Sequence, residues 1–190
     1  IMTVDLRHNV IAGFEEGFPD IVARPDLATL VALPWDPRVA VCICDLHDPI
    51  SGEAYAVDSR GALQRTLGRY AELGIAPVLA HELEFYLCEP DEAAPHGYRP
   101  YVGQDSPPYT VGYLADPRGT LSTMLDAAVA LGLGAIAGAH EYGRGQYEIN
   151  LRHGDALNAA DRAFRFKDLV KELAARDGLR ATFMGKAFNG

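Results

Sequence analysis

Four glutamates in two short segments are the residues of this chain whose types and spacing best suit the binding of a metal ion. The first segment reads His81-Glu82-Leu83-Glu84-Phe85-Tyr86-Leu87, and the second reads His140-Glu141-Tyr142-Gly143-Arg144-Gly145-Gln146-Tyr147-Glu148-Ile149-Asn150-Leu151. Both are apolar and aromatic in a way that is typical of strands. Carboxylates are rarely buried unless they are paired or bind a metal. The four glutamates therefore indicate a cluster that binds the hard divalent cations Mg²⁺ or Mn²⁺.

The spacing of the glutamates favours their convergence. Glu82 and Glu84 are two residues apart, so on a strand they face the same side. Glu141 and Glu148 flank a glycine-containing turn that folds the chain back and can bring both carboxylates toward one point. Two adjacent cations held in this way suit phosphoryl transfer, because they neutralise phosphate oxygens. The alternative is that these are solvated glutamates on a strand face, since a single E-x-E pattern is a weak signal.

The elements that must position these residues follow from hydrophobic periodicity and from capping signals. One helix is expected from Asp58 to Leu73, and a second begins with Asp116 as N-cap and Pro117 at the first helical position. A third helix over 155–176 has the predicted apolar side Leu157, Phe164, Leu169, Val170 and Leu173. Strands are expected over 2–6, 20–24, 29–31, 38–46, 76–88, 134–141, 145–151 and 179–184. This order predicts an α+β fold with a mixed, largely antiparallel sheet backed by helices.

The bulk composition excludes several classes of protein. The 190 residues carry a net charge of −9, which argues against nonspecific binding to nucleic acid or to an anionic membrane. The chain has no apolar run of the roughly 20 residues that a membrane helix needs. The three cysteines lack zinc-site spacing and are expected to be reduced thiols of a cytoplasmic protein.

Four motifs in this chain resemble those of glutamine synthetases, in the order in which that family has them. Residues 81–87 are similar to the family's P-E-x-E-F-[FY]-L strand, and residues 140–151 to its second metal-binding hairpin, H-E-x-[GM]-P-G-Q-x-E. Residues 24–35 resemble the V-P-D-x-x-T-L-x-x-L-P-W segment, and residues 181–186 resemble the A-T-F-M-P-K-P strand. The resemblance covers nearly the whole chain. The segment G-Q-Y-E-I-N-L looks more like that of relatives that use organic amines, which include γ-glutamylpolyamine and similar γ-glutamylamide synthetases.

The resemblance implies an ATP-dependent ligase that joins the γ-carboxylate of glutamate to ammonia or an organic amine through a γ-glutamyl phosphate. It implies that Glu82 binds the nucleotide-side metal, and that Glu84, Glu141 and Glu148 bind the glutamate-side metal. Glu84 would also contact glutamate, and Glu141 would also face the amine. Tyr109, seven residues before Asp116, matches the tyrosine of the family's ammonium site, and His153 lies where it could contact the nucleotide. The family forms homo-oligomeric rings.

The chain also departs from the family pattern. His81, Arg144 and Ala187 stand where the family has prolines. The Asp-Gly-Ser-Ser segment that supplies a catalytic aspartate is absent, and Gly13-Phe14-Glu15-Glu16-Gly17 occupies its approximate place. Asp20, which matches a later aspartate of the family, becomes a substitute catalytic candidate.

We expect the chain to be truncated at both ends relative to the family. Residues 1–35 would be the remnant of a small strand-rich domain with its linker, and residues 36–190 the N-terminal part of the catalytic domain. The isolated chain lacks the family's phosphate-binding arginines and is expected to have no ligase turnover. One alternative is a non-catalytic metal-binding or scaffold relative. Another is a carboxylate-pair glycosidase, which would show no metal dependence.

Overall fold

The computed structural model describes residues 7, 9, 20–94, 96–102 and 107–188. They belong to two compact units, which comprise residues 1–77 and residues 78–190. The strand predicted over 2–6 and the segment 13–17 lie outside the described residues. The domain boundary predicted after residue 35 stays a prediction. None of the helices in the described ranges is long and apolar enough to cross a membrane.

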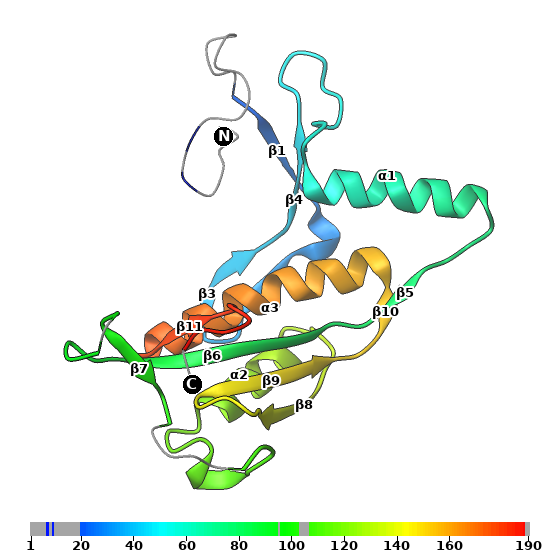
Figure 1. Cartoon of the computed structure of the whole chain (residues 1–190). Coiled ribbons are helices and arrows are strands. Elements are labelled where there is room, and N and C mark those ends of the chain that lie inside the picture. Colours follow the sequence, from blue (N-terminus) through cyan, green and yellow to red (C-terminus); the bar gives the residue numbers. More distant parts are fainter. Residues whose placement is uncertain (1–6, 8, 10–19, 95, 103–106, 189–190) are drawn as a thin grey trace. The chain divides into compact units, whose positions relative to one another are not determined.

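The first unit contains two antiparallel strand pairs (Figure 1). Strand β1 (Val22–Pro25) pairs with β4 (Cys44–His47), and β2 (Val31–Leu33) pairs with β3 (Asp36–Val41). The single strand predicted over 38–46 is therefore wrong. The Ile43 N–H donates to Thr29 Oγ1 over 2.8 Å, and its carbonyl accepts the Asp26 N–H over 2.8 Å. These bonds hold residue 43 against the preceding turn, where the chain changes partner between the two pairs.

The turn itself replaces a predicted strand. A 3-10 helix, η1, spans Leu27–Thr29 and has Asp26 as its N-cap, whose carboxylate accepts the Ala28 N–H over 3.1 Å. The strand predicted over 29–31 is therefore wrong, and β2 begins only at Val31. The reason is local, because an aspartate side chain that bonds to the following backbone favours a turn over a strand.

Helix α1 (Ser59–Glu72) begins and ends where the sequence predicts. The Asp58 carboxylate accepts the N–H groups of Arg60 and Gly61, and Gly74 adopts a φ of 70° beyond the helix end. The Arg60 guanidinium also pairs with Asp26 at 2.7 Å and with Asp45 at 2.6 Å. The Arg60 side chain is only 10% exposed. Its two ion pairs connect α1 to the strand region of its own unit.

The second unit is built on a sheet with the order β11-β6-β9-β8 and with β7 also paired to β6. A two-stranded pair, β5 (Val78–Leu79) with β10 (Gly154–Asp155), stands beside it. Each pairing within the described residues is antiparallel, which confirms the predicted α+β fold. The sheet strands are β6 (Glu82–Pro90), β7 (Tyr98–Pro100), β8 (Ala135–His140), β9 (Gln146–Leu151) and β11 (Arg180–Thr182).

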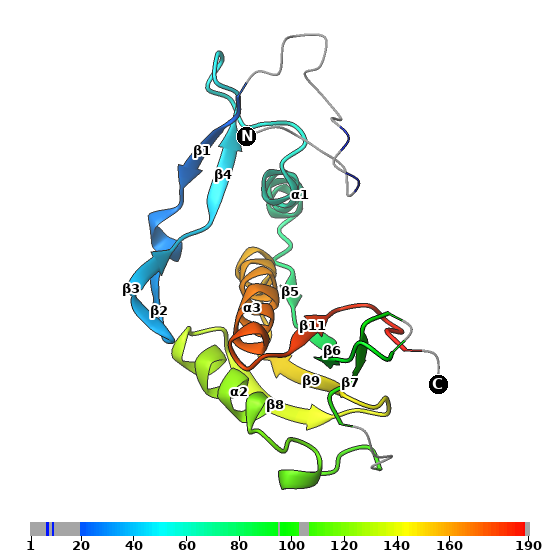
Figure 2. The ribbon, with the colours of Figure 1, turned by 90° about the vertical axis from the view of Figure 1, so that its left-hand side faces the viewer.

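Helices α2 (Thr120–Ala130) and α3 (Ala156–Arg176) cover one face of this sheet (Figure 2). Phe85 of β6 lies at the centre of the core, 6.1 Å from the Tyr147 ring of β9 and 6.0 Å from the Phe166 ring of α3. The prediction that Phe164 faces the core is wrong, because its side chain is 61% exposed. The buried stripe of α3 instead repeats at helical spacing through Phe166, Leu169, Val170 and Leu173.

The start of α2 differs from the prediction as well. Its N-cap is Gly119, with a φ of 71°, and not Asp116. Asp116 still caps the helix from outside, because its carboxylate accepts the N–H groups of Thr120 at 2.9 Å and of Leu121 at 2.8 Å. A 3-10 turn, η2 (Gly112–Leu114), precedes this point.

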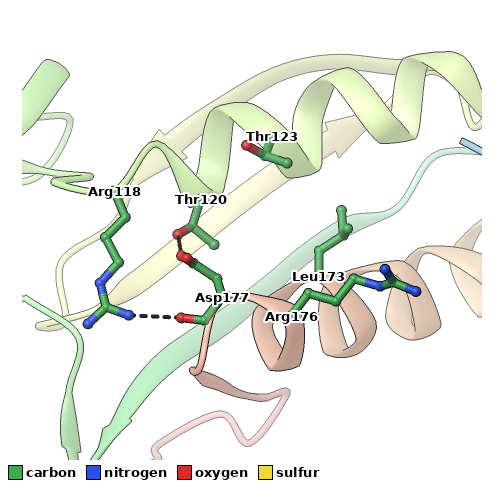
Figure 3. Close-up of a pocket in the computed structure, with 6 residues that line it drawn as sticks. All are labelled: Arg118, Thr120, Thr123, Leu173, Arg176 and Asp177. Carbon is green, nitrogen blue, oxygen red and sulfur yellow. Dashed lines mark hydrogen bonds between the residues drawn. The ribbon is translucent and has the colours of Figure 1, made fainter. Parts of the chain in front are cut away.

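The ends of the two helices meet at a pocket of about 290 Å³ (Figure 3). Here the Thr120 hydroxyl bonds to the Asp177 carboxylate, and Arg118 Nη1 donates to the Asp177 carbonyl over 2.9 Å. These bonds fix the beginning of α2 against the end of α3, and so hold the helical layer together behind the sheet.

Candidate active site

The second face of the sheet is polar, and it is formed by the same strands that bury the core. In the register of β6 and β9, Glu84 lies opposite Glu148 and Glu82 lies opposite Asn150. Alternate residues of β9 are buried, namely Tyr147, Ile149 and Leu151. Because strand side chains alternate between faces, Gln146, Glu148 and Asn150 lie on the opposite face with Glu82 and Glu84.

The turn between β8 and β9 carries Glu141 to this polar face. The Glu141 N–H donates to the Gln146 carbonyl over 2.8 Å, and the Gln146 N–H donates to the Gly143 carbonyl over 3.0 Å. Gly145 has a φ of 67°, and a Cβ atom there would lie 2.8 Å from the Leu87 carbonyl oxygen. The turn therefore requires glycine at this position, both for its backbone conformation and for its close approach to β6.

Three of the four glutamates interact electrostatically. Burial raises the pKa of Glu141, whose side chain is 8% exposed, and the charges of Glu148 and Glu84 raise this pKa further. Within the described residues, none of the four glutamates forms an ion pair with a lysine or arginine. The polar face thus carries concentrated negative charge that the described side chains leave uncompensated.

The donor set of this face fits a hard cation, although the side chains are not gathered around one point. Carboxylate oxygens are the ligands that Mg²⁺ and Mn²⁺ prefer. A cation would relieve the repulsion from Glu148 and Glu84, which adds to burial in raising the Glu141 pKa. In the described part of the chain, no three His, Cys, Asp or Glu side chains already lie in an arrangement that could hold a metal ion.

Tyr109 lies at the edge of the carboxylate cluster in a strained backbone conformation. Its φ is 64°, which is uncommon for a residue other than glycine and often marks a functional site. Its N–H donates to the His140 carbonyl over 2.8 Å, and its ring lies 6.3 Å from that of Tyr142. The Glu141 charge is the largest cause of the raised pKa of Tyr109. The structure therefore places Tyr109 next to the residue that precedes Glu141, where its hydroxyl and the Glu141 carboxylate interact electrostatically.

The remaining predicted residues lie at different places. Glu82 is exposed at the start of β6, and His153 is exposed just after β9. Both are at the same end of the strand pair, because the Leu151 N–H donates to the His81 carbonyl over 3.3 Å. Asp20 is exposed next to β1 in the first unit, and its catalytic role stays a prediction.

Sequence reasoning missed two residues of the site, Gln146 and Asn150. Gln146 and Asn150 hydrogen-bond to the glutamates, and their alternation with Glu148 in the sequence was the signal that could have identified them. His140 is 2% exposed, and neither ring nitrogen has a hydrogen-bond partner in the described structure. Burial lowers the pKa of His140, which favours the neutral imidazole beside the Tyr147 ring, 5.5 Å away.

A pocket of about 330 Å³ adjoins the Tyr109 edge of the site. It lies between the loop that carries Tyr109, the beginning of α2 and the exposed edge of β8. Its lining is largely small or apolar and includes Val111, Leu121 and Ala139. Ala139 is also the register partner of Glu148, so the pocket reaches the strand that pairs with Glu148.

Comparison with known proteins agrees with these features. The family described as the glutamine synthetase catalytic domain matches residues 56–190. A glutamate–isopropylamine ligase from Pseudomonas sp. is 34% identical over 92% of this chain and 39% of its own length. A glutamine synthetase from Mycolicibacterium smegmatis is 36% identical over 94% of this chain and 41% of its own length.

Solved structures show the same likeness. A protein named GmaS, in complex with ADP, superposes with a TM-score of 0.78 and 37% identity over 89% of this chain and 38% of that chain. A more distant glutamine synthase homologue, 20% identical, shares the fold with a TM-score of 0.74 over 92% of this chain and 40% of its own. The present chain spans about two fifths of the length of these relatives. Its matched region, its motifs and its fold all lead to the same conclusion, that the chain belongs to the glutamine synthetase family.

Proposed function

We propose that this chain is the part of an ATP-dependent ligase that carries the metal-binding carboxylates and the edge of the amine site. The γ-phosphoryl group of ATP is transferred to a γ-carboxylate oxygen of glutamate, which forms γ-glutamyl phosphate and ADP. The amine nitrogen then bonds to the γ-carbon, phosphate leaves, and the nitrogen loses a proton. The observation that carries this proposal is the polar sheet face, where Glu84, Glu141 and Glu148 interact without a cationic partner among the described residues.

The proposed roles follow from position and charge. Glu82, Glu84, Glu141 and Glu148 would hold Mg²⁺ or Mn²⁺, which when bound would neutralise the oxygens of the transferred phosphoryl group. Glu82 and His153 share one end of the strand pair and are assigned to the nucleotide side. Glu141 is nearly buried, and its raised pKa makes its carboxylate a stronger base, so the ionised form is suited to accept the proton that the amine loses.

Tyr109 and its pocket are assigned to the amine. The Glu141 carboxylate would attract a cationic amine, while the ring of Tyr109 limits the space beside it. An organic amine is favoured over ammonia by the neighbouring pocket of about 330 Å³, whose apolar side chains can contact a short carbon chain. The similarity to a glutamate–isopropylamine ligase supports the same choice. Ammonia remains the second candidate, because glutamine synthetases are similar to the chain to the same degree.

The proposal is tested with the full-length protein, by measuring phosphate release from ATP in the presence of glutamate and Mg²⁺. The acceptor panel contains ammonia, methylamine, isopropylamine and a diamine. We expect release to require both glutamate and an acceptor, and we expect Glu148→Gln to lower kcat/KM at least about 100-fold, as loss of transition-state charge stabilisation does. Glu172→Gln is the matched control, because Glu172 pairs with Arg176 on the exposed surface of α3.

Three outcomes would contradict parts of the proposal. Wild-type turnover by Glu148→Gln would exclude the carboxylate face as the active site. Metal binding without phosphate release for any acceptor would favour the non-catalytic relative. Glutamate-dependent ATP cleavage by the isolated 190 residues would contradict the expectation that this chain alone is inactive.

A further inference from the structure

Two carboxamide side chains of β9 each hydrogen-bond to one of the glutamates on the polar face. Gln146 Nε2 donates to Glu84 Oε2 over 2.6 Å, and Asn150 Nδ2 donates to Glu148 Oε1 over 2.6 Å. Hydrogen bonds from an amide to an ionised carboxylate are short and stronger than those between neutral groups. The second oxygen of each carboxylate has no partner among the described residues.

The chemistry of these donors suits a metal site better than a salt bridge would. An amide N–H₂ group orients a carboxylate without cancelling its charge, whereas a lysine or arginine in the same place would repel an incoming cation. Each amide bonds to a single oxygen, so the other oxygen stays available to a cation. Groups that hydrogen-bond to metal ligands commonly set their orientation and the affinity of the site.

Gln146 also connects two parts of the site. Its Oε1 accepts the Gly143 N–H over 2.8 Å, while its Nε2 contacts Glu84 on β6. The space is tight, since a Cβ atom on Gly143 would lie 2.6 Å from Gln146 Oε1 and 2.9 Å from the Tyr86 hydroxyl. One amide therefore links the carboxylate of β6 to the turn that carries Glu141.

We propose that Gln146 and Asn150 are positioning residues of the metal site, which hold Glu84 and Glu148 in the orientation that binds Mg²⁺ or Mn²⁺. This inference rests on the proposed function, because it requires that the glutamates bind a divalent cation. It adds that the affinity of the site depends on two neutral residues that do not contact the metal.

The test measures Mn²⁺ binding to the 190-residue chain by isothermal titration calorimetry at pH 8. The variants Gln146→Met and Asn150→Leu keep approximate side-chain volume and remove the donors. We expect each to weaken Mn²⁺ binding by about 10-fold or more, with an unchanged far-UV circular dichroism spectrum. Gln64→Leu is the matched control, because Gln64 Nε2 donates to Asp45 Oδ1 over 3.3 Å in the first unit.

A spectroscopic measurement separates positioning from a general loss of stability. In the folded wild-type chain, addition of Mg²⁺ should shift the side-chain N–H₂ resonances of Gln146 and Asn150, while those of Gln64 stay in place. Loss of Mn²⁺ binding in Glu84→Gln together with wild-type binding in both amide variants would overturn this inference alone. Wild-type binding by Glu84→Gln, or no binding by the unaltered chain, would overturn the metal site of the proposed function and this inference with it.

Discussion

The substitution Glu148→Gln should have opposite effects on stability without and with divalent metal. Glu148 lies directly opposite Glu84 in the sheet register and also raises the pKa of Glu141. Without metal, the neutral amide removes repulsion and should stabilise the chain. With metal, it removes a ligand, so the variant should lose the stabilisation that the wild-type chain gains. The Asn150 donor can bond to the amide oxygen of glutamine as it does to Glu148.

The magnitude follows from the register. Directly opposite residues have Cβ atoms about 5 Å apart, and two charges at that distance repel by about 0.8 kcal/mol in water and about 3 kcal/mol at an effective dielectric constant of 20. Glu84 is exposed, so the lower value applies to that pair, and Glu141 adds a similar term. We therefore expect Glu148→Gln to raise the free energy of unfolding of the metal-free chain by about 1–2 kcal/mol. For a unit of this size the melting temperature should rise by about 4 °C per kcal/mol.

The assay is thermal unfolding with and without Mn²⁺. At a concentration 100-fold above Kd, a bound ligand adds about 2.7 kcal/mol of stability, so the wild-type chain should be the more stable form with metal and the less stable form without it. Glu172→Gln should change stability by no more than about 0.5 kcal/mol, because exposed ion pairs contribute little, and it should respond to metal as the wild-type chain does. If Glu148→Gln and the wild-type chain were equally stable both without and with Mn²⁺, the reasoning that Glu148 repels the other glutamates and binds the metal would be refuted.

Three further predictions concern the scaffold. Gly145→Ala should lower the free energy of unfolding by about 2–4 kcal/mol in urea titrations, because its φ of 67° and its contact with β6 both disfavour a Cβ atom; a loss below about 0.5 kcal/mol would contradict this. Burial raises the pKa of Cys88 from 9.0 to about 11, so at pH 8 its thiolate fraction and alkylation rate, followed by mass spectrometry, should be about 100-fold lower than in the urea-unfolded chain. Since the folded state keeps this proton, the Cys88 contribution to stability should be lost as pH rises from about 9 to about 11. Arg60→Ala should destabilise the first unit by about 2–3 kcal/mol, because two partly buried aspartates lose their cation; fluorescence of Trp35, the only tryptophan, should report this, and an unchanged urea midpoint would contradict it.

Much of the second unit could be predicted from the sequence because its signals are local and agree with one another. The Asp155 cap and Gly178 delimit α3, and the residues between them have helical periodicity. The alternation of polar and apolar residues along β9 predicts which of its side chains are buried. The turn at residues 142–145 predicts a hairpin. Each of these features depends on neighbours in sequence, so no knowledge of tertiary contacts was needed.

The errors lie where tertiary contacts decide the outcome. The continuous apolar run over 38–46 gives no sign that Ile43 bonds back to Thr29, and this contact is what divides the strand. Asp116 does cap α2, although from four residues before its first residue, because the intervening loop lets its carboxylate reach the helix. The cytoplasmic location, the homo-oligomeric ring and the domain boundary after residue 35 stay predictions.

Stability and chemistry in the second unit depend on the same register of β9. The pairing that buries Tyr147 and Ile149 against the helices places Glu148 opposite Glu84 on the other face. A slip of one residue would bury Glu148 and expose Tyr147, since every side chain would change face. The aromatic contacts of Tyr147 with Phe85 and with His140 oppose such a slip. The apolar core therefore determines where the carboxylates lie, and the amides of Gln146 and Asn150 then determine how two of them are oriented.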